Sequence, residues 1–272
     1  MSLSQQHIRV AVVGAEGRMG SMLIKFIAQN KKVFLGAALV RKGSNVVGTD
    51  VGELVGIHPL NIMVTDDIVN VLNTFDILID FTTPKSTESF LLICKKHKKS
   101  MIIGTTGFNE IAKKFIQEIS QDIPIVFSEN FSIGMNLIYK LLVTTAKLIG
   151  EYSDIKIIER HHKEKIDIPS GTALKIKEII NKNIAVNSQS SIIDVSEVSS
   201  HENRKKKINV ISIRTRDVVG EHKVIFSTID ERVEINHKVF NRMIFMHGII
   251  KACFWLKEKK SGLYSMKDVL NI

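Results

Sequence analysis

The segment from Glu159 to Ala173 holds the densest group of residues that could do chemistry. It contains two adjacent histidines, His161 and His162, and Lys165 four residues after the first. Imidazole exchanges protons near neutral pH, and a positioned lysine can supply a proton or stabilise a developing charge. Histidine pairs also serve as structural residues or metal ligands, but no third ligand stands at a suitable spacing. We therefore expect acid–base chemistry here, and no metal.

The end of the same segment is typical of a helix N-terminus. The sequence Pro-Ser-Gly-Thr at 169–172 comes just before the apolar positions Ala173, Leu174 and Ile176. Backbone N–H groups and hydroxyls at such a terminus bind carboxylates well. The segment as a whole suits an anionic substrate that must also be protonated.

A glycine-rich loop stands near the start of the chain. Residues 14–20 read Gly-Ala-Glu-Gly-Arg-Met-Gly, after the apolar run Ile8 to Val13 and at the opening of a helical pattern from Arg18 to Asn30. Glycines permit a tight turn that brings backbone N–H groups close to a pyrophosphate, and a helix N-terminus adds partial positive charge. Glycines also make turns without ligands, but the order of strand, loop and helix favours a dinucleotide site.

The end of the next predicted strand indicates which dinucleotide binds. NAD sites usually place a carboxylate about 20 residues beyond the glycine loop, where it binds the ribose hydroxyls. Here the strand Val33 to Val40 ends without a carboxylate, and Arg41 and Lys42 follow. A guanidinium suits a phosphate. We expect Arg41 to bind the 2′-phosphate of NADPH, with Lys42 assisting, and NADH to bind more weakly.

The elements that must position these residues alternate in the first half of the chain. Helical patterns separate apolar runs, which predicts a parallel sheet with helices on both faces and a Rossmann-like domain. Further strands are expected at Phe75 to Phe81, Met101 to Ile103 and Ile123 to Phe127, and further helices at Thr87 to His97 and Glu110 to Ile119.

The pattern changes after Phe131, where strands accumulate. Helices are expected at Asn136 to Ile149, Leu174 to Ile180 and Met243 to Trp255, and strands at Ile155 to Glu159, Ile192 to Val198, Ile208 to Ile213, His222 to Ile229 and Arg232 to His237, with polar loops at 183–191 and 199–207. The fold class is therefore α/β, with a Rossmann-like dinucleotide-binding domain plus a mixed α+β domain for substrate binding and oligomerisation. The predicted boundaries are 1–131, completed by 242–272, and 132–241.

Composition excludes several classes of protein. The net charge is +10, but the lysine-rich runs at 95–99 and 205–207 lack interleaved aromatic residues, so we expect no nucleic-acid partner. No apolar run approaches the roughly 18 residues of a membrane span, and the N-terminus has no signal-peptide pattern. Cys94 and Cys253 lie in helical patterns without metal-ligand spacing, which predicts reduced packing residues. We expect a cytoplasmic protein.

Taken together, the motifs identify a resemblance to the dihydrodipicolinate reductase family. The segment 159–173 resembles the family signature E-x-H-H-x-x-K-x-D-x-P-S-G-T-A. The resemblance covers nearly the whole chain, through DFTTP at 80–84, IGTTGF at 103–108, SENFSIGMN at 128–136, VVGEH at 218–222, His237, Lys238 and Arg242, and GLYSMKDVL at 262–270. It implies reduction of a small cyclic dicarboxylate imine by NADPH on the route to diaminopimelate and lysine, in a homotetramer built through the second domain's sheet.

The resemblance also implies a role for individual residues. His161 would be the proton donor or acceptor and Lys165 a second proton donor, while His162, Gly171 and Thr172 would hold the substrate. The cofactor residues would be Gly14, Ala15, Glu16, Gly17, Arg18 and Met19 at the pyrophosphate, Arg41 at the 2′-phosphate, Gly104, Thr105 and Thr106 beside the nicotinamide, and Ser128, Glu129, Asn130 and Phe131 as a further wall.

Some positions depart from the family, and other functions compete with this one. Many relatives carry Glu at the Val40 position, Gly at Arg216 and a Pro-Gly turn at 205–207. Another two-domain Rossmann oxidoreductase would share the fold but not the cluster of His161, His162, Lys165 and the Ser-Gly-Thr turn. A non-catalytic NADPH sensor would bind cofactor without turnover, and a basic nucleic-acid-binding protein would show salt-sensitive DNA affinity.

Overall fold

The computed structural model describes residues 7–184, 208–216 and 218–272, and these form two compact units. One unit comprises Met1–Ile133 together with Met243–Ile272, and the other comprises Gly134–Arg242. The predicted strand at 192–198 and most of the polar loops around it lie outside the described residues. Each unit has its own sheet and its own core.

The first unit is built on a seven-stranded sheet in which every pairing is parallel. The strand order is β11-β6-β5-β4-β1-β2-β3. The chain therefore adds β2 and β3 on one side of β1 and then places the later strands on the other side of β1. This order contains the 3-2-1-4-5-6 order of Rossmann folds, which confirms the predicted fold class. The strands are β1 (Ile8–Val13), β2 (Val33–Leu39), β3 (Val64–Thr65), β4 (Ile77–Asp80), β5 (Ser100–Ile103), β6 (Pro124–Phe127) and β11 (Gly262–Tyr264).

Helices cover both faces of this sheet, because its strands bury side chains on both sides. Val10 and Val12 of β1 belong to one buried cluster, while Ala11 and Val13 belong to another, as alternation along a strand requires. One cluster includes residues of α1 (Arg18–Ala28), α2 (Val51–Val55), α7 (Met243–Lys257) and α8 (Met266–Leu270), and the other includes residues of η1 (Val69–Thr74), α3 (Pro84–Lys96) and α4 (Glu110–Ile119).

The two cysteines are packing residues, as predicted. Cys94 lies in α3 and Cys253 in α7, both are free and fully buried, and they belong to different core clusters. Burial raises the pKa of both thiols, that of Cys253 to about 12. Neither thiol is therefore a nucleophile at neutral pH.

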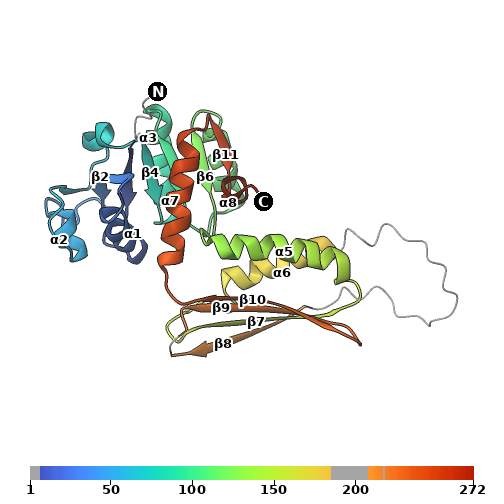
Figure 1. Cartoon of the computed structure of the whole chain (residues 1–272). Helices are drawn as coiled ribbons and strands as arrows, with labels where there is room; N and C mark the ends of the chain where they lie inside the picture. Colours follow the sequence, from blue (N-terminus) through green and yellow to red (C-terminus); the bar gives the residue numbers. More distant parts are fainter. Residues whose placement is uncertain (1–6, 185–207, 217) are drawn as a thin grey trace, which may run out of the picture. The chain divides into compact units, whose positions relative to one another are not determined.

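The second unit is a four-stranded mixed sheet with the order β10-β9-β7-β8 (Figure 1). Only β7 and β8 pair in parallel, which confirms the predicted mixed α+β character. Its core contains residues from both helices and alternate residues of the strands, so one face of the sheet is covered. The elements are α5 (Ile133–Ile149), β7 (Asp154–His162), α6 (Gly171–Ile184), β8 (Asn209–Thr215), β9 (Gly220–Ser227) and β10 (Arg232–Val239).

Candidate active site

The segments predicted to bind a dinucleotide lie along one edge of the seven-stranded sheet. Gly14 follows β1, Arg41 follows β2, Gly104 follows β5 and Ser128 follows β6. Because the strands are parallel, all four positions are at the carboxyl edge, and the strand order reverses beside β1. Ligands of open α/β sheets bind at this edge near such a switch point. The fold thus brings the predicted cofactor segments to a common edge.

The glycine loop has the geometry of a phosphate cradle. Gly14 has a φ of +74°, and the Gly17 N–H donates to the Gly14 carbonyl at 2.9 Å, which closes a tight turn. A Cβ on Gly20 would collide with the same carbonyl, so the helix can pack closely only with glycine there. Gly17 is the N-cap of α1 and has no side chain to cap it, and the first turn has no acidic residue. These features suit an anionic ligand at the start of α1.

A buried carboxylate holds the neighbouring loops in place. Asp80, at the end of β4, accepts hydrogen bonds from the Thr82 backbone and hydroxyl at 2.9 and 2.6 Å, and from the Thr87 hydroxyl at 2.8 Å. The Thr105 hydroxyl also lies beside it, at 3.4 Å. Burial raises the pKa of Asp80, and these hydrogen bonds partly offset the rise. Asp80 therefore ties the loop after β4 to α3 and to the loop after β5.

The predicted cofactor residues differ in how their side chains are placed. Ala15, Thr105 and Phe131 are buried, and the Phe131 ring packs edge-on against Phe81 with centroids 5.4 Å apart. Such residues could contact a cofactor only through the backbone. The exposed members of the set are Glu16, Gly17, Arg18, Arg41, Thr106 and Glu129, and the partly exposed ones are Gly14, Met19, Gly104, Ser128 and Asn130.

The loop after β2 places Arg41 in solvent but also contacts two carboxylates from other loops. The Gly43 N–H donates to Asp66 at 2.8 Å, and the Ser44 hydroxyl donates to Glu16 at 3.0 Å. Val40 is 5% exposed and belongs to the core cluster around α1 and α7. A carboxylate at position 40 would therefore be buried in this conformation, at a cost in stability. Arg41 would attract a 2′-phosphate, whereas the carboxylates of Glu16 and Asp66 would repel it. Any preference for NADPH depends on the attraction being the stronger of the two.

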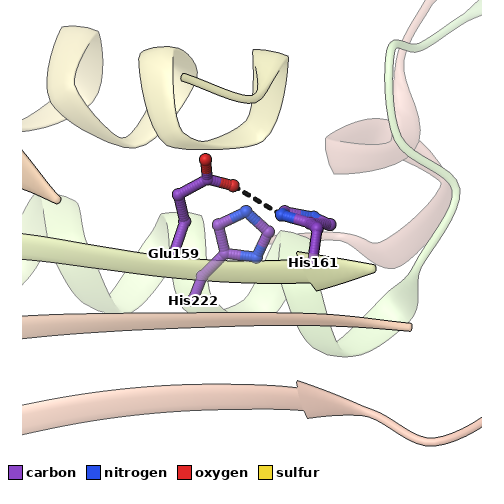
Figure 2. Close-up of side chains that lie close together, drawn as sticks. All are labelled: Glu159, His161 and His222. Carbon is purple, nitrogen blue, oxygen red and sulfur yellow. Dashed lines mark ion pairs between the residues drawn. The ribbon is translucent and has the colours of Figure 1, made fainter. Parts of the chain in front are cut away.

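In the second unit, Glu159 and His161 form a buried pair (Figure 2). The two residues are two apart on β7, so their side chains lie on the same face of the strand, which is the covered face. Glu159 Oε2 lies 2.5 Å from His161 Nδ1, and neither atom has another hydrogen-bonding partner among the described residues. The other oxygen, Oε1, accepts a hydrogen bond from Arg214 Nη1 at 3.0 Å. Glu159 is completely buried.

Burial and neighbouring charges have opposite effects on the pKa values of this pair. Burial opposes ionisation of Glu159, but the Ser212 hydroxyl, Arg214, the Ser170 hydroxyl and the charge of His161 outweigh it and lower its pKa. Burial also lowers the pKa of His161; Glu159 opposes that shift, while Lys165 and Arg214 add to it. The carboxylate is thus the group that favours the protonated imidazole.

A second buried histidine packs against the first. His222 of β9 contacts His161 in an edge-to-face arrangement with ring centroids 5.1 Å apart, and its Nε2 lies 3.1 Å from the Ser170 hydroxyl. That hydroxyl accepts the Ala173 N–H at the start of α6. Burial, followed by the charge of His161, lowers the pKa of His222 to about 3, so the ring is neutral at physiological pH. His222 therefore joins His161 to the N-terminus of α6.

Lys165 lies in the turn between β7 and α6. Its Nζ is 2.7 Å from Asp167 Oδ1, and its side chain is 23% exposed. Arg214 supports this turn by donating to the backbone carbonyls of Lys165 at 3.3 Å and of Asp167 at 2.7 Å. One arginine thus contacts both Glu159 and the segment that carries the lysine.

The remaining predicted substrate residues are more exposed. Gly171 and Thr172 form the first turn of α6, directly after the buried Ser170. His162 is next to His161 on β7, so strand alternation turns it to the opposite face, where its Nε2 lies 3.2 Å from Arg242 Nη2. Of these residues, Gly171 and Thr172 adjoin the buried cluster through Ser170, and His162 does not share its face.

The structure brings together three residues that could ligate a metal, and only His161 of the histidine pair considered from the sequence is among them. Glu159, His161 and His222 each offer an atom within 4.8 Å of the others. Two ligands of one tetrahedral zinc ion stand about 3.3 Å apart, since each is about 2.0–2.1 Å from the metal. Glu159 and His161 approach more closely than that, and Arg214 contacts the same carboxylate. The geometry favours a proton shared by an ion pair over a metal centre.

Sequence reasoning gave no role to Glu159, Arg214 or His222. A signal for Glu159 was available, because residues two apart on a strand share a face. Arg214 and His222 come from β8 and β9, and the pairing of these strands with β7 places them beside Glu159. Their position in the sequence carries no such information.

Comparison with known proteins identifies the family. Residues 8–131 match the family model described as dihydrodipicolinate reductase, N-terminus, and residues 134–270 match dihydrodipicolinate reductase, C-terminus. The chain belongs to the dihydrodipicolinate reductase family. The predicted resemblance is confirmed, and with it the assignment of the chain to an oxidoreductase family.

Solved structures share the fold over nearly the whole chain. A dipicolinate-bound dihydrodipicolinate reductase from Paenisporosarcina sp. TG-14 is 23% identical, with a TM-score of 0.74, and the match covers 98% of this chain and 100% of that one. A probable dehydrogenase from Thermotoga maritima is 11% identical (TM-score 0.61; 97% and 93% covered). GenD2 from gentamicin A biosynthesis, in complex with NAD, is 12% identical (TM-score 0.60; 97% and 90% covered). These three structures are similar to this chain in fold.

None of the helices in the described residues is long and apolar enough to cross a membrane.

Proposed function

We propose that this chain is an NADPH-dependent 4-hydroxy-tetrahydrodipicolinate reductase. It would reduce the dihydrodipicolinate-type cyclic imine, formed by loss of water from 4-hydroxy-tetrahydrodipicolinate, to tetrahydrodipicolinate on the route to diaminopimelate and lysine. The observation that carries the proposal is the buried Glu159–His161 pair beside the start of α6, within a chain of this reductase family. The related reductase solved with dipicolinate supports a small cyclic dicarboxylate as substrate.

The residues of the site suit this reaction. A bound nicotinamide would supply the hydride, which adds to a carbon of the conjugated imine and leaves an enamine-like anion. That anion needs a proton, and His161 can give it from Nε2 while Nδ1 faces Glu159. Gly220 leaves room at this nitrogen, since a Cβ there would lie only 3.3 Å from it. Lys165 can stabilise the developing charge or supply a proton.

Carboxylates of the substrate need partners that replace their hydration. The first turn of α6 offers backbone N–H groups at Gly171 and the hydroxyl of Thr172. Asp167 lies beside this turn, where the Gly171 N–H helps to lower the pKa of its carboxyl. We propose that Gly171 and Thr172 bind a substrate carboxylate in the same way, with His162 as a further binding residue. The substrate would be the main small-molecule partner, and no nucleic acid or membrane is part of the proposal.

The proposed reductase differs from other oxidoreductases of this fold in its substrate. A sugar or amino-acid dehydrogenase on the same fold would need neither the His161–Glu159 pair nor Lys165 next to a carboxylate-binding turn. A non-catalytic NADPH sensor would bind cofactor without consuming it. Incubation with freshly made synthase product, a panel of sugars and a panel of amino acids separates the three functions. Cofactor consumption with the synthase product alone is expected.

Cofactor preference provides the first specific prediction. Arg41 can give the 2′-phosphate of NADPH a charge-assisted hydrogen bond, worth about 10- to 150-fold in affinity before solvent screening reduces it. Since Arg41 is exposed and Glu16 and Asp66 contact its loop, we expect NADPH to be favoured over NADH by roughly tenfold at low salt. Arg41→Ala should weaken NADPH binding by about that factor and leave NADH binding unchanged.

The matched control is Lys25→Ala, which removes an exposed cation from α1. Dissociation constants for both cofactors, measured by calorimetry at low and at high salt, check the prediction. Equal weakening of NADPH and NADH by Arg41→Ala would show that Arg41 does not contact the 2′-phosphate.

The second unit supports a homotetramer, the assembly implied by the family resemblance. One face of its sheet packs on α5 and α6 (Figure 1), while the other carries Ile158, Ile211, Ile213 and Ile225. Ile158 and Ile211 are directly paired across β7 and β8, and Ile211 is 45% exposed. Apolar side chains grouped on a sheet face favour association with another sheet. We propose that this face joins subunits.

Ile225→Glu should therefore convert the tetramer into smaller species, because it places a charge in the proposed interface. Ile111→Glu is the control, since it adds the same charge at an exposed position of α4 in the other unit. Light scattering at micromolar concentration measures the mass of each. A wild-type monomer, or an Ile225→Glu variant that remains tetrameric, would contradict this interface.

A further inference from the structure

We infer that Glu159 is a positioning residue that holds His161 with Nδ1 toward its carboxylate, and so presents Nε2 as the nitrogen that exchanges a proton with the substrate. The inference rests on the proposed function, in which His161 is the proton donor. It adds a residue to which the sequence motif gave no role. Glu159 itself does not touch the substrate in this account.

The carboxylate of Glu159 is buried and held in a fixed position. Glu159 is completely buried, and its two oxygens face different partners: Oε2 faces His161 Nδ1, and Oε1 accepts from Arg214 Nη1. A buried carboxylate without partners would be costly, so both contacts restrict its rotation. Because Arg214 also binds two carbonyls of the 165–167 turn, its guanidinium is itself fixed. Arg214 therefore holds Glu159, and Glu159 holds His161.

The carboxylate also selects the tautomer of His161. A carboxylate acceptor at Nδ1 requires a proton on that nitrogen, which leaves Nε2 as the atom that gains and loses the second proton. Nε2 faces Gly220, the residue type that leaves most space beside it. Without Glu159 the neutral ring could take either tautomer, and only one of them presents a basic Nε2. In this role Glu159 orients the imidazole ring of His161.

The carboxylate also stabilises the charged form of His161. The groups that face His161 are Glu159 on its own strand, Lys165 in the turn that follows, Arg214 on β8 and His222 on β9. Glu159 is the one anion among these four residues. Burial, Lys165 and Arg214 all disfavour the imidazolium, and Glu159 opposes them. Removing Glu159 and removing Arg214 should therefore move the proton affinity of His161 in opposite directions, which a purely structural role would not do.

The test compares Glu159→Gln, Glu159→Asp and Arg214→Gln with the wild type, with Glu178→Gln as the control. Glu178 lies on α6 in the same unit and pairs with Lys175 and Lys182 at the surface. The pKa of His161 is followed by NMR titration of histidine-labelled protein without substrate, using His161→Gln to assign the signal. Turnover is measured across pH in parallel, and circular dichroism shows whether each variant folds.

We expect Glu159→Gln to lower the pKa of His161 and to move the alkaline limb of kcat to lower pH. At neutral pH kcat should fall at least about tenfold, as part of the benefit of general acid catalysis is lost, while KM changes little. Glu159→Asp should keep more of the wild-type profile, because it keeps the charge. Arg214→Gln should raise the pKa of His161, and Glu178→Gln should match the wild type.

An unchanged His161 titration in Glu159→Gln would overturn the inference, as would shifts of the same sign in Glu159→Gln and Arg214→Gln. One zinc ion per chain in the purified protein, lost in Glu159→Gln, would also overturn it in favour of a metal site. Failure of the proposed function is a separate result: the wild type would then consume no NADPH with the synthase product, whatever the titrations show. If Glu159→Gln does not fold, Arg214→Gln still tests the inference, because a lowered or unchanged pKa of His161 in that variant would overturn it.

Discussion

His161→Gln is expected to lower turnover by at least about 100-fold, since a positioned general acid or base contributes typically 10²–10⁴-fold. Glutamine keeps a polar side chain beside Glu159 but cannot exchange a proton near neutral pH. The ring is buried next to a carboxylate, as a residue that must cycle between neutral and charged forms requires. Cofactor affinity should hardly change, because His161 lies in the second unit and the dinucleotide segments lie in the first.

Steady-state turnover with saturating substrate, together with NADPH binding by calorimetry, checks this prediction. His97→Gln is the control, since His97 is exposed at the end of α3. A His161→Gln enzyme with near-normal turnover would remove His161 from its proposed role and leave the buried pair as a structural feature.

Lys165→Met should also lower turnover by about 100-fold, because it removes the cation proposed to stabilise the anion that forms after hydride addition. Methionine retains much of the length of the side chain while removing its charge. The partner Asp167, 2.7 Å from Nζ, holds the ammonium in the turn between β7 and α6. The effect should appear in kcat, since the charge it stabilises develops during the reaction.

Lys163→Met provides a matched control in the same turn, where the side chain is exposed. The measurement is kcat and KM for both variants at several pH values. A raised KM with an unchanged kcat would show that Lys165 binds the substrate without taking part in the chemistry.

The parts of the fold that could be predicted are those with strong hydrophobic periodicity. The alternating strands and helices of the first 131 residues indicated a parallel sheet, and the strands after residue 150 indicated a mixed one. The short elements α2, β3, η1, β11 and α8 were not expected. β3 has only two residues and η1 is a 3-10 turn, so neither is long enough to show a period.

The candidate site could be predicted where its residues are adjacent in sequence. His161, Lys165 and the turn at 169–172 lie in one segment, and their residue types indicate proton transfer to an anionic substrate. Arg214 and His222 reach the same cluster only because β8 and β9 flank β7 in the sheet. Strand order depends on long-range pairing, which local sequence patterns do not contain.

Side-chain direction was the other feature that local patterns did not give. Val40 was expected to mark the ribose end of the cofactor site, but its side chain packs in the core while Arg41 points to solvent. In the same way, His161 and His162 are neighbours in sequence but lie on opposite faces of β7. Alternation along a strand separates adjacent residues and joins those two apart, as it joins Glu159 and His161.

The most direct test of the proposed function is cofactor consumption with freshly made synthase product, 4-hydroxy-tetrahydrodipicolinate, followed by loss of NADPH absorbance. We predict that NADPH is consumed in equal amount to the tetrahydrodipicolinate formed, that His161→Gln abolishes most of this rate, and that sugars and amino acids give none. An inactive wild-type protein that binds NADPH, or a protein that consumes NADPH with a sugar or an amino acid in place of the synthase product, would contradict the account.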